Sequence, residues 1–205
     1  MEIAIRSLAE HKMTEVSDCV TLLKDSLAGL AYLHQTNIIH RDIKPANILL
    51  TREDPVQWKL SDFGMSKMAE VTTTFCGSPM YLAPEIGELE YGAYTTAVDI
   101  WALGIVGLEY TCGFGRGNSK LLRDMTKRKP WNQAVIQQVP RSPLAQYLEL
   151  MLELVPTKRP AACKLVDMLG SWAGQSQGSS ANAVQSDKNH GADSSRIPYL
   201  RATIA

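Results

Sequence analysis

The chain has 205 residues, of which 45% are hydrophobic and 20% charged, a globular mixture that excludes a wholly disordered or collagen-like chain. Lysine plus arginine and aspartate plus glutamate each number 21, so the basic excess expected of a general nucleic-acid or membrane-surface binder is missing. The four cysteines are scattered, which argues against a zinc site or disulfide framework and favours a reducing compartment. We find no signal-peptide pattern at the N-terminus, and the longest apolar stretch is too short to span a membrane.

The first part of the chain predicts one helix followed by short strands. Apolar residues at three- and four-residue spacings predict an amphipathic helix over 18–34. Short apolar runs at 38–39, 48–50 and 58–60 predict small strands that frame loops. Residues 64–95 lack a clear period and contain several glycines and prolines, which predicts a long loop of the kind that is usually functional.

The second part of the chain predicts helices. Thr96 and Asp99 resemble a capping box that opens a helix over 97–110. That helix is apolar on nearly all sides, so it should form the buried centre of the fold. Two further helices are expected over 144–154 and over 160–170, the last with a proline at its first position.

The end of the chain changes in composition. From Gly174 to Arg196 it is rich in Ser, Gly, Asn, Gln and Asp, and it cannot bury enough apolar surface to offset the entropy of ordering. We therefore predict one folded domain over 1–172 and a disordered tail over 173–205. The expected fold is mainly α, with a few short β-strands.

Three motifs carry the chemistry. The first is His40-Arg41-Asp42-Ile43-Lys44-Pro45-Ala46-Asn47, the second is Asp62-Phe63-Gly64, and the third is Ala83-Pro84-Glu85. Alone, each could be ordinary surface or turn sequence. In this order the three motifs resemble the C-terminal lobe of the eukaryotic-type protein kinases. With Lys44 after Asp42, the first motif resembles its version in the serine/threonine-specific members.

The resemblance implies transfer of the γ-phosphate of ATP to Ser/Thr hydroxyls of proteins, a reaction that depends on positioning and charge neutralisation. Asp42 would accept the proton of the substrate hydroxyl, and Lys44 would place a positive charge beside the phosphoryl group. Asn47 and Asp62 offer the hard oxygen ligands that Mg²⁺ prefers. For His40 we expect packing or hydrogen bonding and no proton transfer.

The long loop resembles a kinase activation segment. Thr74 lies where many members are phosphorylated, and a phosphate there could pair with Arg41. Thr72 and Thr73 compete for that role, and an unmodified loop remains an alternative. Ser78 resembles the residue that faces the protein substrate beside the catalytic aspartate.

Two further positions resemble structural residues of the family. Glu85 resembles the partner of a late arginine, which is Arg159 in this chain. Asp99 resembles the residue that accepts hydrogen bonds from the backbone of the catalytic loop, which is the first motif (residues 40–47). Asp99 is also placed to cap a helix N-terminus, and both roles can hold.

The chain lacks the motifs of the small kinase lobe. No strand lysine precedes His40. The one dense glycine run, Gly113 to Gly117, follows the predicted central helix, whereas the glycine-rich loop of the family precedes the three motifs along the chain. We therefore expect little or no activity from these residues alone, and an exposed lobe–lobe surface that a partner could cover. The expected partners are ATP and a protein substrate, with no nucleic acid or membrane, in the cytoplasm or the nucleus. The alternative is a non-catalytic kinase-like binding module, a decoy or scaffold.

Overall fold

The structure is a computed structural model of the chain. It describes residues 3–63, 67–68, 79–86, 95–115 and 128–180. The chain divides into two compact units, Met1–Leu169 and Gly170–Ala205, and all elements that form the site lie in the first.

Two small antiparallel sheets frame the loops of the first unit. The larger sheet has the strand order β1–β3–β4, and the smaller pairs β2 with β5. The bounds are β1 (Arg6–Ser7), β2 (Ile38–Ile39), β3 (Ile48–Glu53), β4 (Val56–Leu60) and β5 (Lys67–Met68). The strands predicted at 38–39, 48–50 and 58–60 are confirmed as β2, β3 and β4. The two-residue strands β1 and β5 were not predicted, and β5 lies within the residues 64–95 predicted as a loop, where it pairs with β2.

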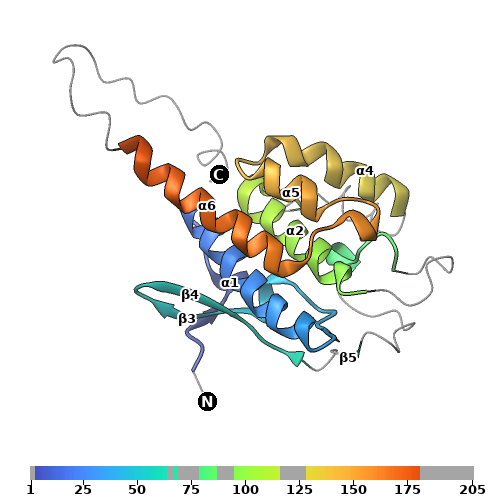
Figure 1. Cartoon of the computed structure of the whole chain (residues 1–205), viewed down its shortest axis with the longest axis horizontal. Coiled ribbons are helices and arrows are strands. Elements are labelled where there is room, and N and C mark those ends of the chain that lie inside the picture. The colour runs from blue at the N-terminus through green and yellow to red at the C-terminus, as the bar shows by residue number, and fades with distance from the viewer. Residues whose placement is uncertain (1–2, 64–66, 69–78, 87–94, 116–127, 181–205) are drawn as a thin grey trace, which may run out of the picture. The chain divides into compact units, whose positions relative to one another are not determined.

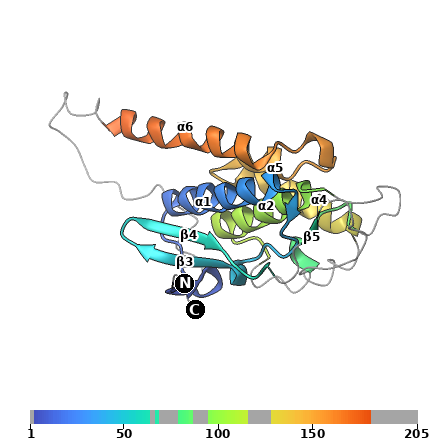
Figure 2. The ribbon, with the colours of Figure 1, turned by 60° about the horizontal axis from the view of Figure 1, so that its bottom comes forward.

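Helices cover the larger sheet. The α-helices are α1 (Val16–Gln35), α2 (Ala97–Cys112), α4 (Arg128–Gln138), α5 (Ala145–Met151) and α6 (Ala162–Ser180). Helix α1 contacts both β4 and α2, and α2 in turn contacts α4 and α5. Figures 1 and 2 show this arrangement, with β3 and β4 on one side of α1 and α2.

Helix α2 is the buried centre that its all-round apolar sequence predicts. Every residue from Val98 to Leu108 is buried. Two glycines let neighbouring helices approach closely, because a Cβ atom on Gly104 would lie 2.9 Å from Leu152 Cδ2, and one on Gly107 would lie 2.9 Å from Leu148 Cδ2. The helix ends at Gly113, whose φ of 66° is left-handed and favours glycine.

Three details of the predicted helices are wrong. Thr96 makes no side-chain cap on α2, and the Asp99 carboxylate bonds to the catalytic loop instead. Helix α5 is shorter than the range 144–154, because the carbonyl oxygens of Glu153 and Leu154 accept hydrogen bonds from Arg159. Helix α6 begins two residues after Pro160, where the carbonyl of Ala161 accepts the amide of Leu165.

The predicted end of the last helix at Gly170 is also wrong. Helix α6 continues to Ser180, so residues 173–180 of the expected tail are helical. Extending a formed helix adds one hydrogen bond per residue without a new nucleation cost, which explains how a polar segment can continue it. Residues 181–205 of that tail lie outside the described residues.

Candidate active site

The hairpin of β3 and β4 brings two of the predicted magnesium ligands to one end of the sheet. Ile48 pairs with Leu60, and just beyond this pair the amide of Ser61 donates to the carbonyl oxygen of Asn47 at 2.9 Å. The hydroxyl of Ser61 donates to the same oxygen at 3.1 Å. Asp62 follows directly, with a left-handed φ of 59° and an exposed side chain.

The Asp42 carboxylate is held by its two predicted neighbours. Asp42 Oδ2 accepts hydrogen bonds from Lys44 Nζ at 2.6 Å and from Asn47 Nδ2 at 2.9 Å. Asn47 Nδ2 also donates to the Asp42 carbonyl at 2.8 Å. Because the amide nitrogen is used within the loop, the amide oxygen of Asn47 is the atom left to accept or to ligate. Asp42 and Asn47 are buried, with exposed fractions of 8% and 6%. Burial and these hydrogen bonds fix the positions of both side chains without a bound ligand.

His40 ties the catalytic loop to the segment that carries Asp62. Its Nε2 lies 3.0 Å from the carbonyl oxygen of Ser61, and its ring centroid is 5.2 Å from that of Phe63. The side chain is fully buried. This is the packing and hydrogen-bonding role predicted for His40.

Asp99 anchors the catalytic loop to the central helix. Its Oδ2 accepts the amide of His40 and its Oδ1 the amide of Arg41, both at 2.9 Å. Arg41 has a φ of 73°, a left-handed conformation that is strained for a residue with a side chain. The two amide contacts therefore hold the backbone in an unfavourable shape immediately before Asp42.

Glu85 and Arg159 form a buried, two-pronged ion pair. Arg159 Nη1 donates to Glu85 Oε1 at 2.6 Å, and Nη2 donates to Oε2 at 2.8 Å. The guanidinium also donates to the carbonyl of Ala97 and lies 5.1 Å from the ring centroid of Trp101. The pair thus joins the third motif to the start of α2.

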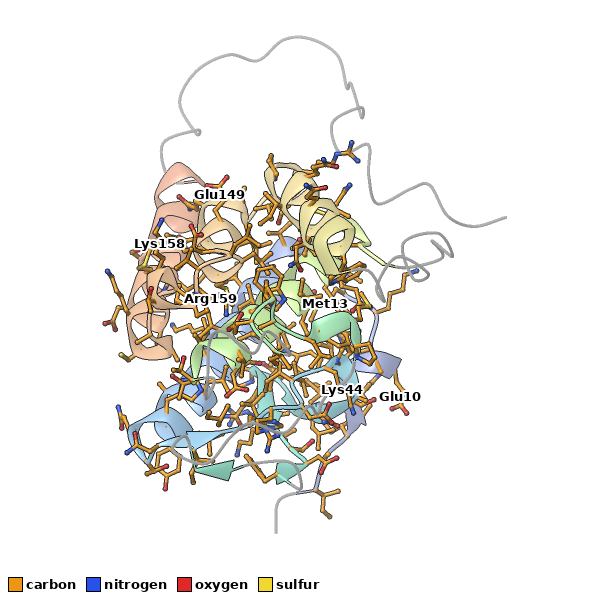
Figure 3. All side chains as sticks on the ribbon, turned by 90° about the vertical axis from the view of Figure 1, so that its right-hand side faces the viewer. Glu10, Met13, Lys44, Glu149, Lys158 and Arg159 are labelled. Atoms are coloured by element: carbon orange, nitrogen blue, oxygen red, sulfur yellow. The ribbon has the colours of Figure 1, made fainter. Side chains whose placement is uncertain are left out.

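A cavity of about 510 Å³ opens beside the catalytic loop. Lys44 lines it together with Glu10, Tyr81 and Glu109, and the Tyr81 hydroxyl donates to Glu109 Oε2 at 2.9 Å. Figure 3 labels Lys44 and Glu10 on this side of the molecule. Sequence reasoning missed Glu10 and Glu109, because no motif links either of them to the catalytic loop.

Several predicted residues lie outside the part of the chain that the structure describes. They are Gly64, the candidate phosphorylation sites Thr72, Thr73 and Thr74, and the substrate-facing Ser78. Their roles stay predictions. Arg41, the expected partner of a phosphate on Thr74, is buried at 7% exposure.

The donor set at the hairpin end suits magnesium bound to a nucleotide. Within the described residues, no group of three or more His, Cys, Asp or Glu side chains could hold a metal ion. One amide oxygen and one carboxylate fit Mg²⁺ nonetheless, since this ion keeps several waters and takes further ligands from substrate phosphates. None of the described helices is both long and apolar enough for a membrane span.

A buried aspartate and asparagine, a partly exposed lysine and an exposed aspartate are the residue types that the expected phosphoryl-transfer site requires. The comparisons with known proteins agree, because the family model described as protein kinase domain matches residues 2–169. The chain belongs to the protein kinase family, and its relatives include serine/threonine kinases.

Two relatives illustrate the similarity. The calcium/calmodulin-dependent protein kinase cmkA of Emericella nidulans is 36% identical over 160 residues, which are 74% of this chain and 38% of that protein. The DNA damage response protein kinase DUN1 of Saccharomyces cerevisiae is 43% identical over 113 residues, which are 45% of this chain and 22% of that protein. The chain therefore spans well under half the length of these relatives.

Proposed function

We propose that this chain carries the catalytic loop and the metal ligands of a serine/threonine protein kinase, which transfers the γ-phosphate of ATP to Ser/Thr hydroxyls of proteins. The observation that supports this most is the Asp42 carboxylate, held by Lys44 and Asn47 beside the hairpin end that carries Asp62. Membership of the protein kinase family supports it independently.

The contacts and the chemistry of these residues support a role for each of them. Asp42 accepts the proton of the substrate hydroxyl, because an ionised carboxylate is an acceptor fixed in place by two donors. Lys44 is partly exposed and positively charged, so it neutralises charge on the transferred group. Asn47 and Asp62 would hold Mg²⁺, which supplies neutralisation of the phosphate oxygens when bound.

The first test measures nucleotide binding by NMR titration of the 205-residue chain with ATP, in the presence and absence of Mg²⁺. We expect shifts at Asn47 and Asp62 that require the metal. Asp62→Asn should weaken the Mg²⁺-dependent binding about tenfold or more, because it replaces the one charged protein ligand by a neutral amide. The matched control is Asp54→Asn in the exposed turn between β3 and β4, at the other end of the same hairpin, which should leave binding unchanged.

The second test measures phosphotransfer to pools of serine, threonine and tyrosine peptides. We expect slow transfer to serine and threonine only, because these residues include no glycine-rich loop pattern to clamp the phosphates. Asp42→Asn should reduce the rate about 100-fold or more. ATP binding that ignores both Mg²⁺ and Asp62→Asn would contradict the proposal and favour the non-catalytic binding module.

A further inference from the structure

A tyrosine at the end of α2 is tied to η1 (Leu8–Glu10), a short 3₁₀-helix near the start of the chain. The hydroxyl of Tyr110 donates to the carbonyl oxygen of Leu8 at 2.7 Å, across 102 positions of the sequence. The same oxygen accepts the amide of His11 at 3.1 Å, which is the hydrogen bond that closes η1. Both lone pairs of this carbonyl are therefore in use, one within η1 and one toward α2.

Helix η1 forms one wall of the cavity that opens beside the catalytic loop. Glu10 and His11 line the cavity on the side of η1. Lys44 lines it from the catalytic loop, and Tyr110 lines it from the end of α2. Helix η1 also packs against the turn Pro45–Asn47 of the catalytic loop. The hydrogen bond from Tyr110 therefore joins two walls of the same cavity.

The cavity adjoins the carboxylate that is proposed to accept the substrate proton. Lys44 lines the cavity, and its Nζ lies 2.6 Å from Asp42 Oδ2. A serine or threonine side chain is small against a volume of about 510 Å³, so the cavity has room for a neighbouring side chain of a protein substrate. If a wall of a binding site leaves its place for part of the time, the apparent affinity falls by the fraction of molecules that keep the binding-competent shape.

We propose that Tyr110 is a positioning residue for the binding of protein substrate. Its hydroxyl holds η1 at the end of α2 and thereby keeps the wall that carries Glu10 and His11 in place. The inference rests on the proposed function for the nature of the occupant, whereas the hydrogen bond between Tyr110 and Leu8 is independent of that function.

The test compares Tyr110→Phe with the natural 205-residue chain. This variant removes the hydroxyl but keeps the ring, and Leu8 O stays bonded to the amide of His11, so no buried acceptor is left unpaired. The amide of His11 should exchange its hydrogen about threefold to tenfold faster, whereas that of Leu103 in the centre of α2 should keep its protection.

Binding is measured on the same two chains by NMR titration with a pool of serine peptides and, separately, with ATP and Mg²⁺. In Tyr110→Phe the midpoint concentration of the peptide titration should rise about threefold to tenfold, because a smaller fraction of molecules keeps η1 in place. The midpoint of the ATP titration should not change. A general loss of structure would weaken both kinds of binding, so this difference separates a positioning role from a structural one.

Tyr32→Phe is the matched control, because it removes the same group from a side chain of α1 that is 71% exposed. It should leave both the exchange at His11 and the peptide midpoint unchanged. The proposal is overturned by unchanged exchange at His11 in Tyr110→Phe, by faster exchange with an unchanged peptide midpoint, or by a natural chain that binds ATP with Mg²⁺ but no serine peptide. A natural chain without Mg²⁺-dependent ATP binding contradicts the proposed function instead, so the two failures are distinguishable.

Discussion

At the scale of single residues, Arg159 shows how one side chain can join segments far apart in the sequence. Its three nitrogens donate to both oxygens of Glu85 and to backbone carbonyls of Glu153, Leu154 and Ala97. The side chain is fully buried. Removing one half of such a pair leaves an uncompensated charge, which costs more than the intact pair contributes.

Arg159→Leu should therefore lower the free energy of unfolding by about 3–5 kcal/mol. Urea denaturation followed by tryptophan fluorescence measures this loss. The control is Arg141→Leu, which removes an exposed arginine whose contact with Gln138 is 3.3 Å long, and which should change stability by less than about 0.5 kcal/mol. Equal losses in the two variants would contradict a structural role for the buried pair.

Asp25 provides a prediction about pH. Its Oδ2 accepts the amide of Trp58 at 2.9 Å. Burial raises the pKa of this carboxyl above its ordinary value of 3.8, although the Trp58 amide, Lys24 and Arg52 act in the opposite direction. A raised pKa means that the folded chain holds the proton more tightly than the unfolded chain, so this group's contribution to stability is lost as pH rises through the raised pKa.

Asp25→Asn should remove that pH dependence while keeping an oxygen that accepts the Trp58 amide. Relative to the natural chain, the variant should gain stability as the pH is raised from below 3.8 to 7. Thermal unfolding at several pH values measures the difference. Asp25→Ala, which lacks the acceptor, should lose about 1 kcal/mol at neutral pH. A stability difference between Asp25→Asn and the natural chain that does not vary with pH would contradict the raised pKa.

At the scale of elements, the contact between α2 and α5 depends on glycine. A Cβ atom on Gly104 would lie 2.9 Å from Leu152 Cδ2 and 3.1 Å from Met151 Cβ, whereas one on Gly107 would meet mainly the tip of Leu148. A side-chain tip can rotate away, but a Cβ atom moves only with its backbone. Overpacking of this kind costs about 1–3 kcal/mol.

Gly104→Ala should therefore destabilise the chain by about 1–3 kcal/mol, and by more than Gly107→Ala. The control is Gly170→Ala in α6, where no atom lies within 4 Å of the added Cβ atom. There the better helix propensity of alanine should stabilise by up to about 1 kcal/mol. Urea midpoints of the three variants measure the order of their stabilities. A stabilising effect of Gly104→Ala would contradict the prediction, because it would show that the two helices are free to separate.

The elements also show what the sequence determines locally. Helices α1 and α2 were predicted to within two residues at each end, because an amphipathic or all-round apolar pattern identifies them without knowledge of the fold. Helix α4 was missed, although Trp131, Val135 and Val139 repeat every four residues, because most of the segment is polar. The end of α5 could not be predicted, since it depends on hydrogen bonds from Arg159.

At the scale of the whole molecule, the sequence predicts the residues of the catalytic loop but not the distant residues that hold the loop in place. Asp42, Asn47 and Asp62 follow from motifs, and the pairing of two adjacent strands brings the last two together. His34 belongs to the same network through its hydrogen bond to Asp99, a contact across 65 positions. Such contacts come from the packing of α1 against α2, which no local pattern specifies.

The compact unit Met1–Leu169 sets where the chain can be shortened. Ala162, Leu165 and Leu169 in the first turns of α6 are buried at 1%, 0% and 0% exposure. A chain ending at residue 180 keeps these side chains and should unfold in one cooperative step with an unchanged urea midpoint. A chain ending at residue 161 loses two buried leucines, each worth about 2–5 kcal/mol, and should be largely unfolded.

Tryptophan fluorescence follows both shortened chains, because Trp101 and Trp131 are buried at 0% and 2% exposure within this unit. The double variant Leu165→Ala, Leu169→Ala in the chain ending at residue 180 separates loss of core packing from loss of length. It should be destabilised by about 4–10 kcal/mol, twice the range for one buried leucine. A midpoint in this variant equal to that of the unsubstituted chain of the same length would show that α6 contributes no core to the kinase fold.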